Sequence, residues 1–294
     1  MKKASLHFDQ SLPAVYGTEQ RLAPRITRVL AHNPSPFTFR GTGVYLVGDA
    51  KRVTVIDPGP NDPSHLDALL AAIGGRTVSH ILITHTHRDH SPAAAPLKAV
   101  TGAKTYGYGP HARHDGDVEE GGDRDFAPDV TVRDGDIIES GDDRFQCVFT
   151  PGHTSNHMCY ALEEEKALFT GDHVMGWSTT VVAPPDGDMG AYMRSLEKLI
   201  ARQDKILYPT HGSPILKPGP FLRAYLSHRK MRETQIARAI ERGDDRVPLL
   251  VRTLYAGLAP ALHRAAALTV EAHLKHMTED GRVAALEDGR YVKL

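Results

Sequence analysis

Short apolar runs separated by turn residues occupy the first two thirds of the chain. Residues 43–48 and 52–56 are rich in β-branched side chains, and a Pro-Gly turn at 57–60 ends the second run. Runs of this length and composition are typical of β-strands. The same pattern predicts further strands at 78–84, 145–150, 166–170 and 206–208.

Helical spacing appears between these runs. Asp62 is a favourable N-cap, and Pro63 suits the first position of a helix. Leucines then recur at helical spacing up to Ile73, and Gly74 ends the helix. A second helix is predicted at 188–202. Strands and helices that alternate in this way predict a layered α/β fold, in which ligands collect at strand ends.

The pattern changes near residue 220, where strands give way to helices. Helical periodicity covers residues 222–241, 248–255 and 260–276. The chain closes with a hairpin whose turn is Asp288-Gly289. Three helices and a terminal hairpin are typical of a winged-helix module. We therefore expect two domains, 1–219 and 220–294.

Composition and charge exclude several classes of protein. The 294 residues carry a formal net charge of −1, so no global field draws the chain to nucleic acid or to a membrane. No apolar run approaches the ~20 residues that a membrane span requires. At the N-terminus Asp9 precedes any apolar stretch of the kind found in secretory signals. We expect a cytoplasmic protein with no membrane partner.

Two cysteines are too few for a disulfide framework. Cys147 and Cys159 both lie in apolar runs, which indicates buried, reduced thiols. Any metal site would then consist of nitrogen and oxygen ligands. Residues 115–136 are polar and acidic, and we expect them to form a surface loop.

The motif His-Thr-His-Arg-Asp-His at residues 85–90 places four metal-binding side chains within six residues. A helix would spread these side chains around its circumference, whereas a loop that follows a strand turns several of them toward one point. Neutral imidazole is a common metal ligand, and carboxylates complete such sites. The four candidate ligands are His85, His87, Asp89 and His90.

Three more loops each carry one candidate ligand next to a glycine. They follow short apolar runs and present His153, Asp172 and His211. Seven ligands are too many for one tetrahedral zinc ion. They suit two metal ions about 3.5–4 Å apart. Zinc is the first choice for these ligand types, with manganese or iron as the alternatives.

In these motifs the sequence resembles the metallo-β-lactamase-fold superfamily over roughly residues 25–215. The resemblance implies an α+β or α/β fold, a four-layer αββα metallo-β-lactamase sandwich in which two mixed sheets pack face to face between helices. The small C-terminal winged-helix domain would follow it. The resemblance also implies that one metal takes His85, His87 and His153, that the other takes Asp89, His90 and His211, and that Asp172 and a hydroxide bridge them.

The acid at the bridging position narrows the range of reactions that the resemblance implies. Members of the superfamily that cleave antibiotics lack an acid at the place of Asp172, so the resemblance points to branches that hydrolyse thioesters, lactones or phosphodiesters. Two metals supply a hydroxide near neutral pH. Asp89 and Asp172 are the catalytic candidates, with Asp89 expected to orient the nucleophile and accept its proton. Asp57, which ends a strand, is expected to support a metal ligand from behind.

A finer resemblance lies in residues 150–158, 168–182 and 192–196. These segments are similar to the endoribonuclease branch known as β-lactamase-like protein 2 and its bacterial relatives, which also carries a C-terminal winged helix. The resemblance implies cleavage of single-stranded RNA. This chain departs from the branch at residues 43–45, which read Gly-Val-Tyr where relatives usually show Asn-Thr-Tyr. That departure weakens the inference that this chain acts on the same substrate as the branch.

Two other functions stay open. One is hydrolysis of a small thioester, ester or lactone, as in the hydroxyacylglutathione hydrolase relatives, which usually end in a purely helical tail. The other is a regulator that binds DNA through the winged helix and keeps a vestigial metal site. The partner is accordingly a small molecule or single-stranded RNA. Trp177, Thr179 and Thr180 are the candidates for lining the substrate pocket.

The winged helix itself allows more than one role. Its first helix carries basic side chains, among them Arg223, Arg229 and Arg232, and a basic helix can contact phosphates. Acidic residues on the same helix favour the other roles, which are packing, capping of the active site or formation of a homodimer.

Overall fold

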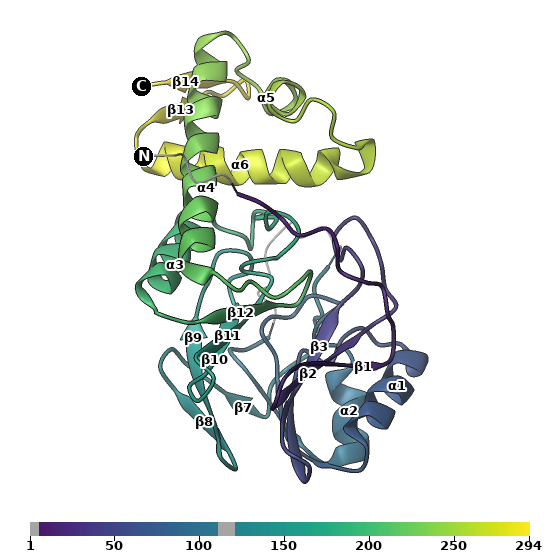
Figure 1. Cartoon of the computed structure of the whole chain (residues 1–294). Helices are drawn as coiled ribbons and strands as arrows, with labels where there is room; N and C mark the ends of the chain where they lie inside the picture. Colours follow the sequence, from purple (N-terminus) through teal and green to yellow (C-terminus); the bar gives the residue numbers. More distant parts are fainter. Residues whose placement is uncertain (1–5, 111–120) are drawn as a thin grey trace.

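Two β-sheets form the centre of the computed structural model, which describes residues 6–110 and 121–294 (Figure 1). The first sheet has the order β1-β2-β3-β4-β5-β6-β7. Its strands are Glu19–Ala23, Ile26–Leu30, Gly43–Gly48, Arg52–Ile56, Thr77–Leu82, Lys104–Gly107 and Val130–Thr131. The second has the order β12-β11-β10-β9-β8. Its strands, from β8 to β12, are Ile137–Ser140, Asp143–Phe149, Met158–Leu162, Ala167–Gly171 and Ile206–Pro209.

Both sheets are mixed, as the sequence predicts. Strands β1 to β4 pair antiparallel, whereas β4 to β7 pair parallel. In the second sheet β11 and β12 are parallel and the other neighbours are antiparallel. Aromatic side chains fill the space between the sheets, with Tyr45 of β3 against Phe169 of β11 at 5.1 Å between ring centroids.

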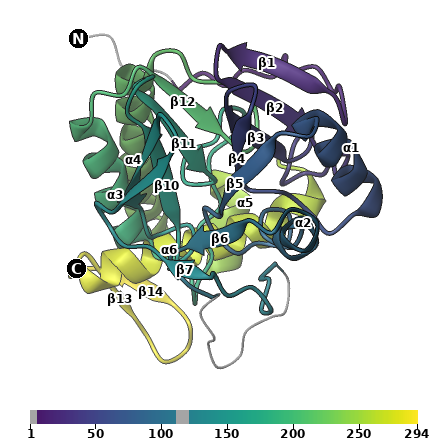
Figure 2. The same ribbon diagram turned by 90° about the horizontal axis from the view of Figure 1, so that it is seen from below.

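Helices cover the outer face of each sheet, which completes the four-layer sandwich (Figure 2). Helices α1 (Pro63–Ile73) and α2 (Ala94–Thr101) pack on the first sheet. Helix α3 (Met189–Ala201) and the first turns of α4 (Pro218–Glu241) pack on the second. Asp62 caps α1, as predicted, because its side chain accepts a hydrogen bond from the Ser64 amide.

The C-terminal segment is the predicted winged helix. After α4 come α5 (Val247–Leu254), the short 3-10 helix η1 (Pro260–Leu262) and α6 (His263–Glu279). A hairpin of β13 (Val283–Ala285) and β14 (Tyr291–Lys293) closes the chain. These elements share a small apolar core of their own.

Helix α4 belongs to both halves of the molecule. Leu222 and Tyr225 in its first turns lie in the core of the second sheet and α3, whereas Ile236 and Ile240 lie in the winged-helix core. The helix starts at Pro218, one turn before the predicted start at residue 222. The expected domain boundary between 219 and 220 stays a prediction, because one unbroken helix runs through it.

Other expectations have mixed outcomes. Cys147 and Cys159 are free and buried, as predicted. The expected loop at 115–136 contains the short strand β7, and its residues 115–120 lie outside the described part of the chain. Within the described ranges, no helix has both the length and the apolar character that crossing a membrane requires.

Candidate metal centre

The candidate ligands lie where strands of the two sheets end. The 85–90 motif follows β5, and His153, Asp172 and His211 follow β9, β11 and β12. Because β9, β11 and β12 run in the same direction, their carboxyl ends share one edge of the second sheet. That edge faces the loop after β5, so all seven predicted side chains gather at one place.

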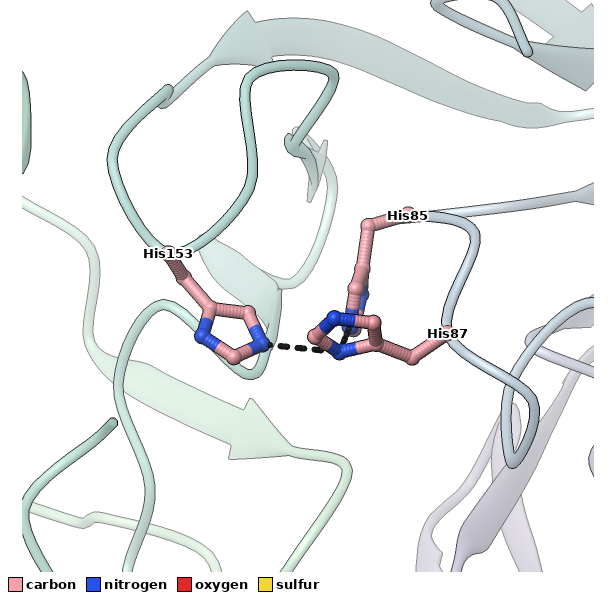
Figure 3. A group of neighbouring side chains, drawn as sticks. All are labelled: His85, His87 and His153. Carbon is pink, nitrogen blue, oxygen red and sulfur yellow. Dashed lines mark hydrogen bonds between the residues drawn. The ribbon is translucent and has the colours of Figure 1, made fainter. Parts of the chain in front are cut away.

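Three histidines form the first group (Figure 3). The Nδ1 atom of His87 lies 2.9 Å from Nε2 of His85 and 3.1 Å from Nε2 of His153. Three ring nitrogens therefore converge on one point, from two loops that are more than sixty residues apart.

The second group consists of Asp89, His90 and His211. Oδ2 of Asp89 lies 3.1 Å from Nε2 of His211 and 3.3 Å from Nε2 of His90. A carboxylate oxygen and two ring nitrogens thus also face a common point.

Asp172 lies between the two groups. Its Oδ1 is 3.4 Å from Nε2 of His211 and 3.6 Å from Nε2 of His90, whereas its Oδ2 is 3.9 Å from Nε2 of His153. One oxygen therefore faces each group. This is the arrangement that the resemblance implies for a bridging carboxylate.

The donor set fits a pair of divalent cations. Nε2 of His90, Nε2 of His211 and Oδ1 of Asp172 are buried, and among the described residues none of them makes a well-aligned hydrogen bond, although they lie close to one another and to Asp89. Buried polar atoms without partners cost free energy, and a metal ion would satisfy all three. Imidazole and carboxylate ligands of this kind suit zinc, manganese or iron.

Protonation differs between the two groups. Burial lowers the pKa of His85 well below its ordinary value and lowers the pKa of His87 to about 3. The pKa of His153 is lowered for the same reason. The first group is therefore neutral near pH 7, which is the form of imidazole that binds a metal.

In the second group, negative charge outweighs the effect of burial. Burial opposes a charge on His90 and His211, but Asp89 and Asp172 raise the pKa of His90 well above its ordinary value and that of His211 to about 10. In the absence of a cation this group is an ion-paired cluster. Binding of a metal would release its protons.

Hydrogen bonds to the outer nitrogens orient the histidine rings. Nδ1 of His211 faces the Gly41 carbonyl at 3.1 Å, and Nδ1 of His153 faces the Val181 carbonyl at 2.7 Å. Each of these bonds leaves Nε2 directed at the centre. Thr42 adds a polar contact on the other side, because its hydroxyl lies 3.3 Å from Oδ2 of Asp89.

Asp57 lies behind His90, at the place where the sequence predicts a supporting acid. Its Oδ2 is 2.9 Å from Nδ1 of His90 and also accepts hydrogen bonds from the hydroxyls of Thr84 and Thr210. Its Oδ1 accepts the Thr84 amide at 2.8 Å. Asp57 thus connects the loop after β4 with the loops that carry His85 and His211.

A cavity of about 730 Å³ opens above the metal ligands. Its floor includes His87, Asp89, His153, Asp172 and His211. Apolar walls come from the 175–185 segment and from residues of η1 and α6 in the winged helix. The winged helix therefore caps the candidate site, which is one of the roles left open by the sequence.

The predicted pocket residues Trp177, Thr179 and Thr180 do not line this cavity. Trp177 instead stacks on Phe39, with ring centroids 4.8 Å apart. Thr180 is buried beneath the site, where its hydroxyl donates to the Asp172 carbonyl at 2.7 Å. Of these three residues, Thr180 supports the loop of Asp172, and none lines the cavity. This corrects the prediction.

Two basic residues of α4 are also not free to contact phosphates. Arg229 is buried, donates to the Thr180 carbonyl and lies over the rings of Tyr192 and Tyr225. Arg232 donates to the Leu254 carbonyl at 3.0 Å. On α4, Arg229 therefore contacts the catalytic domain, whereas Arg232 makes a contact within the winged helix.

Several lining residues carry no signal in the sequence. Arg88 lies inside the 85–90 motif but is not a metal ligand, and Arg124 and Arg264 lie in unrelated segments. Phe37 comes from the loop before β3. Only the tertiary fold brings these four side chains to one cavity.

Comparison with known families matches both parts of the chain. Residues 38–211 match the metallo-beta-lactamase superfamily, and residues 247–290 match the beta-lactamase associated winged helix domain. The first match covers the sandwich and all seven candidate ligands. The second covers most of the small apolar core after α4.

Similar proteins extend over most of the chain. An atrochrysone carboxyl ACP thioesterase of Claviceps purpurea is 31% identical over 79% of this chain and 70% of its own length. A beta-lactamase-like protein 2 homolog of Caenorhabditis elegans is 31% identical over 90% of this chain and 88% of its own. The crystal structure of a metallo-beta-lactamase family protein from Thermus thermophilus has a TM-score of 0.76 and is 21% identical, over 93% of this chain and 100% of that one. At that identity the solved structure supports the fold alone.

Proposed function

The chain belongs to the metallo-β-lactamase superfamily and carries its associated winged helix, and from this premise we propose that it hydrolyses the thioester bond of an acyl substrate with two metal ions, preferably zinc. The observation that carries the proposal is the cavity of about 730 Å³, whose walls are largely apolar and whose floor holds the metal ligands. A cavity of this kind suits a small molecule with an apolar body and one reacting carbonyl.

The residues that would hold the metals are those of the two groups joined by Asp172. When bound, two divalent cations supply a hydroxide near neutral pH and Lewis acidity toward the substrate carbonyl. Because the rings of His85, His87 and His153 are neutral, Asp172 would be the only negatively charged ligand among the described residues for a cation on their side. That imbalance favours an electrophilic role for this side of the centre.

Asp89 is the residue proposed to take a proton. Asp89 lines the cavity, and its Oδ2 lies 3.3 Å from the Thr42 hydroxyl, which helps to orient the carboxylate. A carboxylate held in this way can orient the attacking water and accept its proton. The apolar walls around Met175, Val181 and Leu268 exclude bulk water from the acyl group and leave the reacting carbonyl at the floor.

The thioesterase relative supports this choice of reaction. It is named as an ACP thioesterase, and it is 31% identical over 79% of this chain. Cleavage of single-stranded RNA, the first expectation from the sequence, becomes the second candidate. It is favoured by three arginines among the described residues of the cavity lining, Arg88, Arg124 and Arg264, which are suited to phosphates.

A direct assay separates these candidates. The zinc-loaded protein is incubated with a panel of acyl thioesters, followed by thiol release, and with labelled single-stranded RNA. We expect thiol release and intact RNA. Cleavage of RNA without turnover of any thioester would reverse the order of the two functions.

The variant Asp89→Asn tests the proton acceptor. Loss of a general base lowers turnover by about 100-fold or more, while the histidine group retains at least one metal. Metal content by elemental analysis and thiol release are measured together. Asp67→Asn, an exposed acid on α1, is the matched control. Unchanged turnover in Asp89→Asn would remove this residue from the mechanism.

A further inference from the structure

We propose that Arg28 of β2 is a positioning residue for the candidate ligand His211, because it holds the loop after β12 against the first sheet. Arg28 is not itself a member of the ligand groups, so it would act through that loop without touching a metal. The inference rests on the part of the proposed function that assigns two metal ions to the site. It does not depend on the substrate, since it concerns how tightly one of the metals is bound.

His211 joins two parts of the fold in the second ligand group. Asp89 and His90 follow β5 of the first sheet, whereas His211 follows β12 of the second. β12 is the edge strand of its sheet, next to β11. The second group is therefore complete only where the loop after β12 keeps a fixed position relative to the first sheet.

The first sheet contacts that loop through its backbone carbonyls. The carbonyls of residues 209, 210 and 212 accept hydrogen bonds at 2.6, 2.9 and 3.0 Å from the Tyr45 hydroxyl, the Gly43 amide and the Arg28 guanidinium. In Figure 2 the end of β12 accordingly lies beside β3. The backbone on both sides of His211 is thus held by β2 and β3.

Arg28 makes the contact on the far side of His211, at Gly212. Its side chain is buried, and its Nε and Nη2 atoms donate to Oε1 of Gln20 on β1 at 3.1 and 2.7 Å. A guanidinium presents its N–H groups in a rigid plane, so these two bonds direct Nη1 toward the Gly212 carbonyl. Hydrogen bonds from a charged donor are stronger than those from a neutral one. Arg28 therefore fixes the point where the chain leaves the ligand.

The path of Arg28 explains the glycine at position 43. A Cβ atom on Gly43 would lie 2.9 Å from Cδ of Arg28 and 3.0 Å from the Thr210 carbonyl oxygen, both closer than ordinary van der Waals contact. The backbone of Gly43 is that of a strand and has no positive φ, so its conformation alone does not require glycine. Gly43 is also the first residue at which this chain departs from the endoribonuclease branch. That departure leaves room for Arg28 to reach the His211 loop.

Zinc binding by the metal-free full chain tests this role, with a chromophoric chelator as the competitor. We expect the wild type to bind two zinc ions. In Arg28→Met one of them should bind about tenfold or more weakly, with the other unchanged, because loss of a supporting contact weakens only the metal whose ligand it orients. Gly43→Ala should weaken the same zinc ion, since the added methyl group displaces Arg28. Arg28→Lys should recover part of the loss.

A double-mutant cycle identifies the ligand through which Arg28 acts. In a His211→Ala background, Arg28→Met should cause no further loss of zinc affinity, because no ligand remains in that loop to be positioned. If Arg28→Met does not fold, as judged by circular dichroism, Gly43→Ala and Arg28→Lys are compared in the same two backgrounds.

Arg25→Met is the matched control for a merely structural effect. Arg25 directly precedes β2 and pairs with the buried Asp143 at 2.8 Å. Asp143 begins β9, so this contact lies at the opposite end of β9 from the loop that carries His153. Arg25→Met should lower the free energy of unfolding and leave both zinc affinities unchanged.

The outcomes separate this inference from the proposed function. Two zinc ions bound with wild-type affinity by the Arg28 and Gly43 variants would overturn the inference and leave the two-metal proposal intact. An equal loss at both ions, a similar loss in Arg25→Met, or a further loss in the His211→Ala background would also overturn it. A wild type that binds fewer than two zinc ions would overturn the two-metal proposal, and the inference with it.

Discussion

Several candidate metal ligands are oriented by residues that would not touch the metal. Asp57 is the clearest case, because one buried carboxylate accepts hydrogen bonds from Thr84 and Thr210 and faces Nδ1 of His90. Its backbone has a φ of 49°, a left-handed conformation that is unfavourable for residues other than glycine. Three separate segments meet at this side chain, which is why the unfavourable backbone persists.

Replacement of Asp57 by asparagine should weaken metal binding without unfolding the protein. The amide has the same size, but it carries no charge and presents N–H groups to donors that need an acceptor. Loss of such a supporting contact lowers metal affinity by about 10–100-fold. Zinc affinity is measured by competition with a chromophoric chelator, and folding by circular dichroism. Asp62→Asn is the control, since asparagine caps α1 as well as aspartate does. An unchanged zinc affinity would contradict the role of Asp57.

Residues that act within one loop could be identified from the sequence, whereas those that act across the fold could not. The seven candidate ligands each stand in a short motif beside a glycine or another ligand, and the structure gathers all of them. Thr180 has no such local signal. Its hydroxyl donates to the Asp172 carbonyl, and its amide donates to Tyr225 of α4, which lies in another part of the fold.

At the scale of elements, α4 connects the metal centre to the winged helix. The Arg229 guanidinium donates to the Thr180 carbonyl, and the Thr180 hydroxyl donates to the Asp172 carbonyl at 2.7 Å. Tyr225, one turn earlier on α4, accepts a hydrogen bond from the Thr180 amide at 2.6 Å. The loop that carries the bridging acid is therefore attached to α4 through Thr180.

Arg229→Met should destabilise the chain and loosen the Asp172 loop. A hydrogen bond from a charged group contributes about 1.5–3 kcal/mol, and methionine restores most of the volume. We expect a loss of this size in urea unfolding and a lower zinc affinity. Lys230→Met, an exposed neighbour whose partner Glu197 is also exposed, should change stability by less than about 0.5 kcal/mol. Equal effects of the two variants would show that α4 does not support the site.

Helix α6, which lines one side of the cavity, should limit the length of the acyl chain that the cavity accepts. Ala265 lines the cavity, and a tryptophan there would fill part of the 730 Å³. Under the proposed thioesterase function, Ala265→Trp should reduce kcat/KM for a long acyl thioester by tenfold or more and affect the acetyl thioester much less. Ala201→Trp, at the exposed end of α3, controls for the added indole. A uniform loss at all chain lengths would mean that the substitution distorts the site instead of shortening it.

Elements with clear periodicity could be predicted, and those with buried polar residues or helix breakers could not. Strands β3, β4 and β5 and helix α1 follow from apolar spacing. Strand β2 could not be predicted, because Arg28 interrupts its apolar run. In the structure Arg28 is nevertheless buried, and it donates a hydrogen bond to the Gly212 carbonyl at 3.0 Å. Helix α2 contains Pro96, which suppresses a helical interpretation.

At the scale of the whole molecule, the winged helix is part of the active-site enclosure. The catalytic domain supplies the floor of the cavity, and α6 supplies part of its wall. A change in the stability of the C-terminal domain should therefore affect the catalytic site as well. The stability of that domain depends on a buried charged cluster on α4, which has a definite response to pH.

The cluster is centred on Glu233. This residue is 4% exposed, and its carboxylate lies 2.8 Å from Nδ1 of His276 and 3.3 Å from Nδ1 of His273 and accepts a hydrogen bond from Arg282. Burial raises the pKa of Glu233, but these partners outweigh it and lower the pKa from 4.5 to about 2. A group whose pKa is lower in the folded state stabilises the protein above its unfolded pKa and loses that contribution as the pH falls.

Glu233→Gln should therefore destabilise the protein at pH 6 and matter less in acid. We expect a difference from wild type on the order of 2 kcal/mol at pH 6, which shrinks as the pH falls from 4.5 toward 2 and Glu233 of the wild type becomes protonated. The free energy of unfolding is measured by urea titration at several pH values in metal-free buffer, so that the metal ligands contribute alike to both proteins. Glu241→Gln, on the exposed side of α4, should give a nearly pH-independent difference. A gap between wild type and Glu233→Gln that stays constant down to pH 2 would mean that the cluster stabilises the winged helix through packing, because ionisation of Glu233 would then make no contribution.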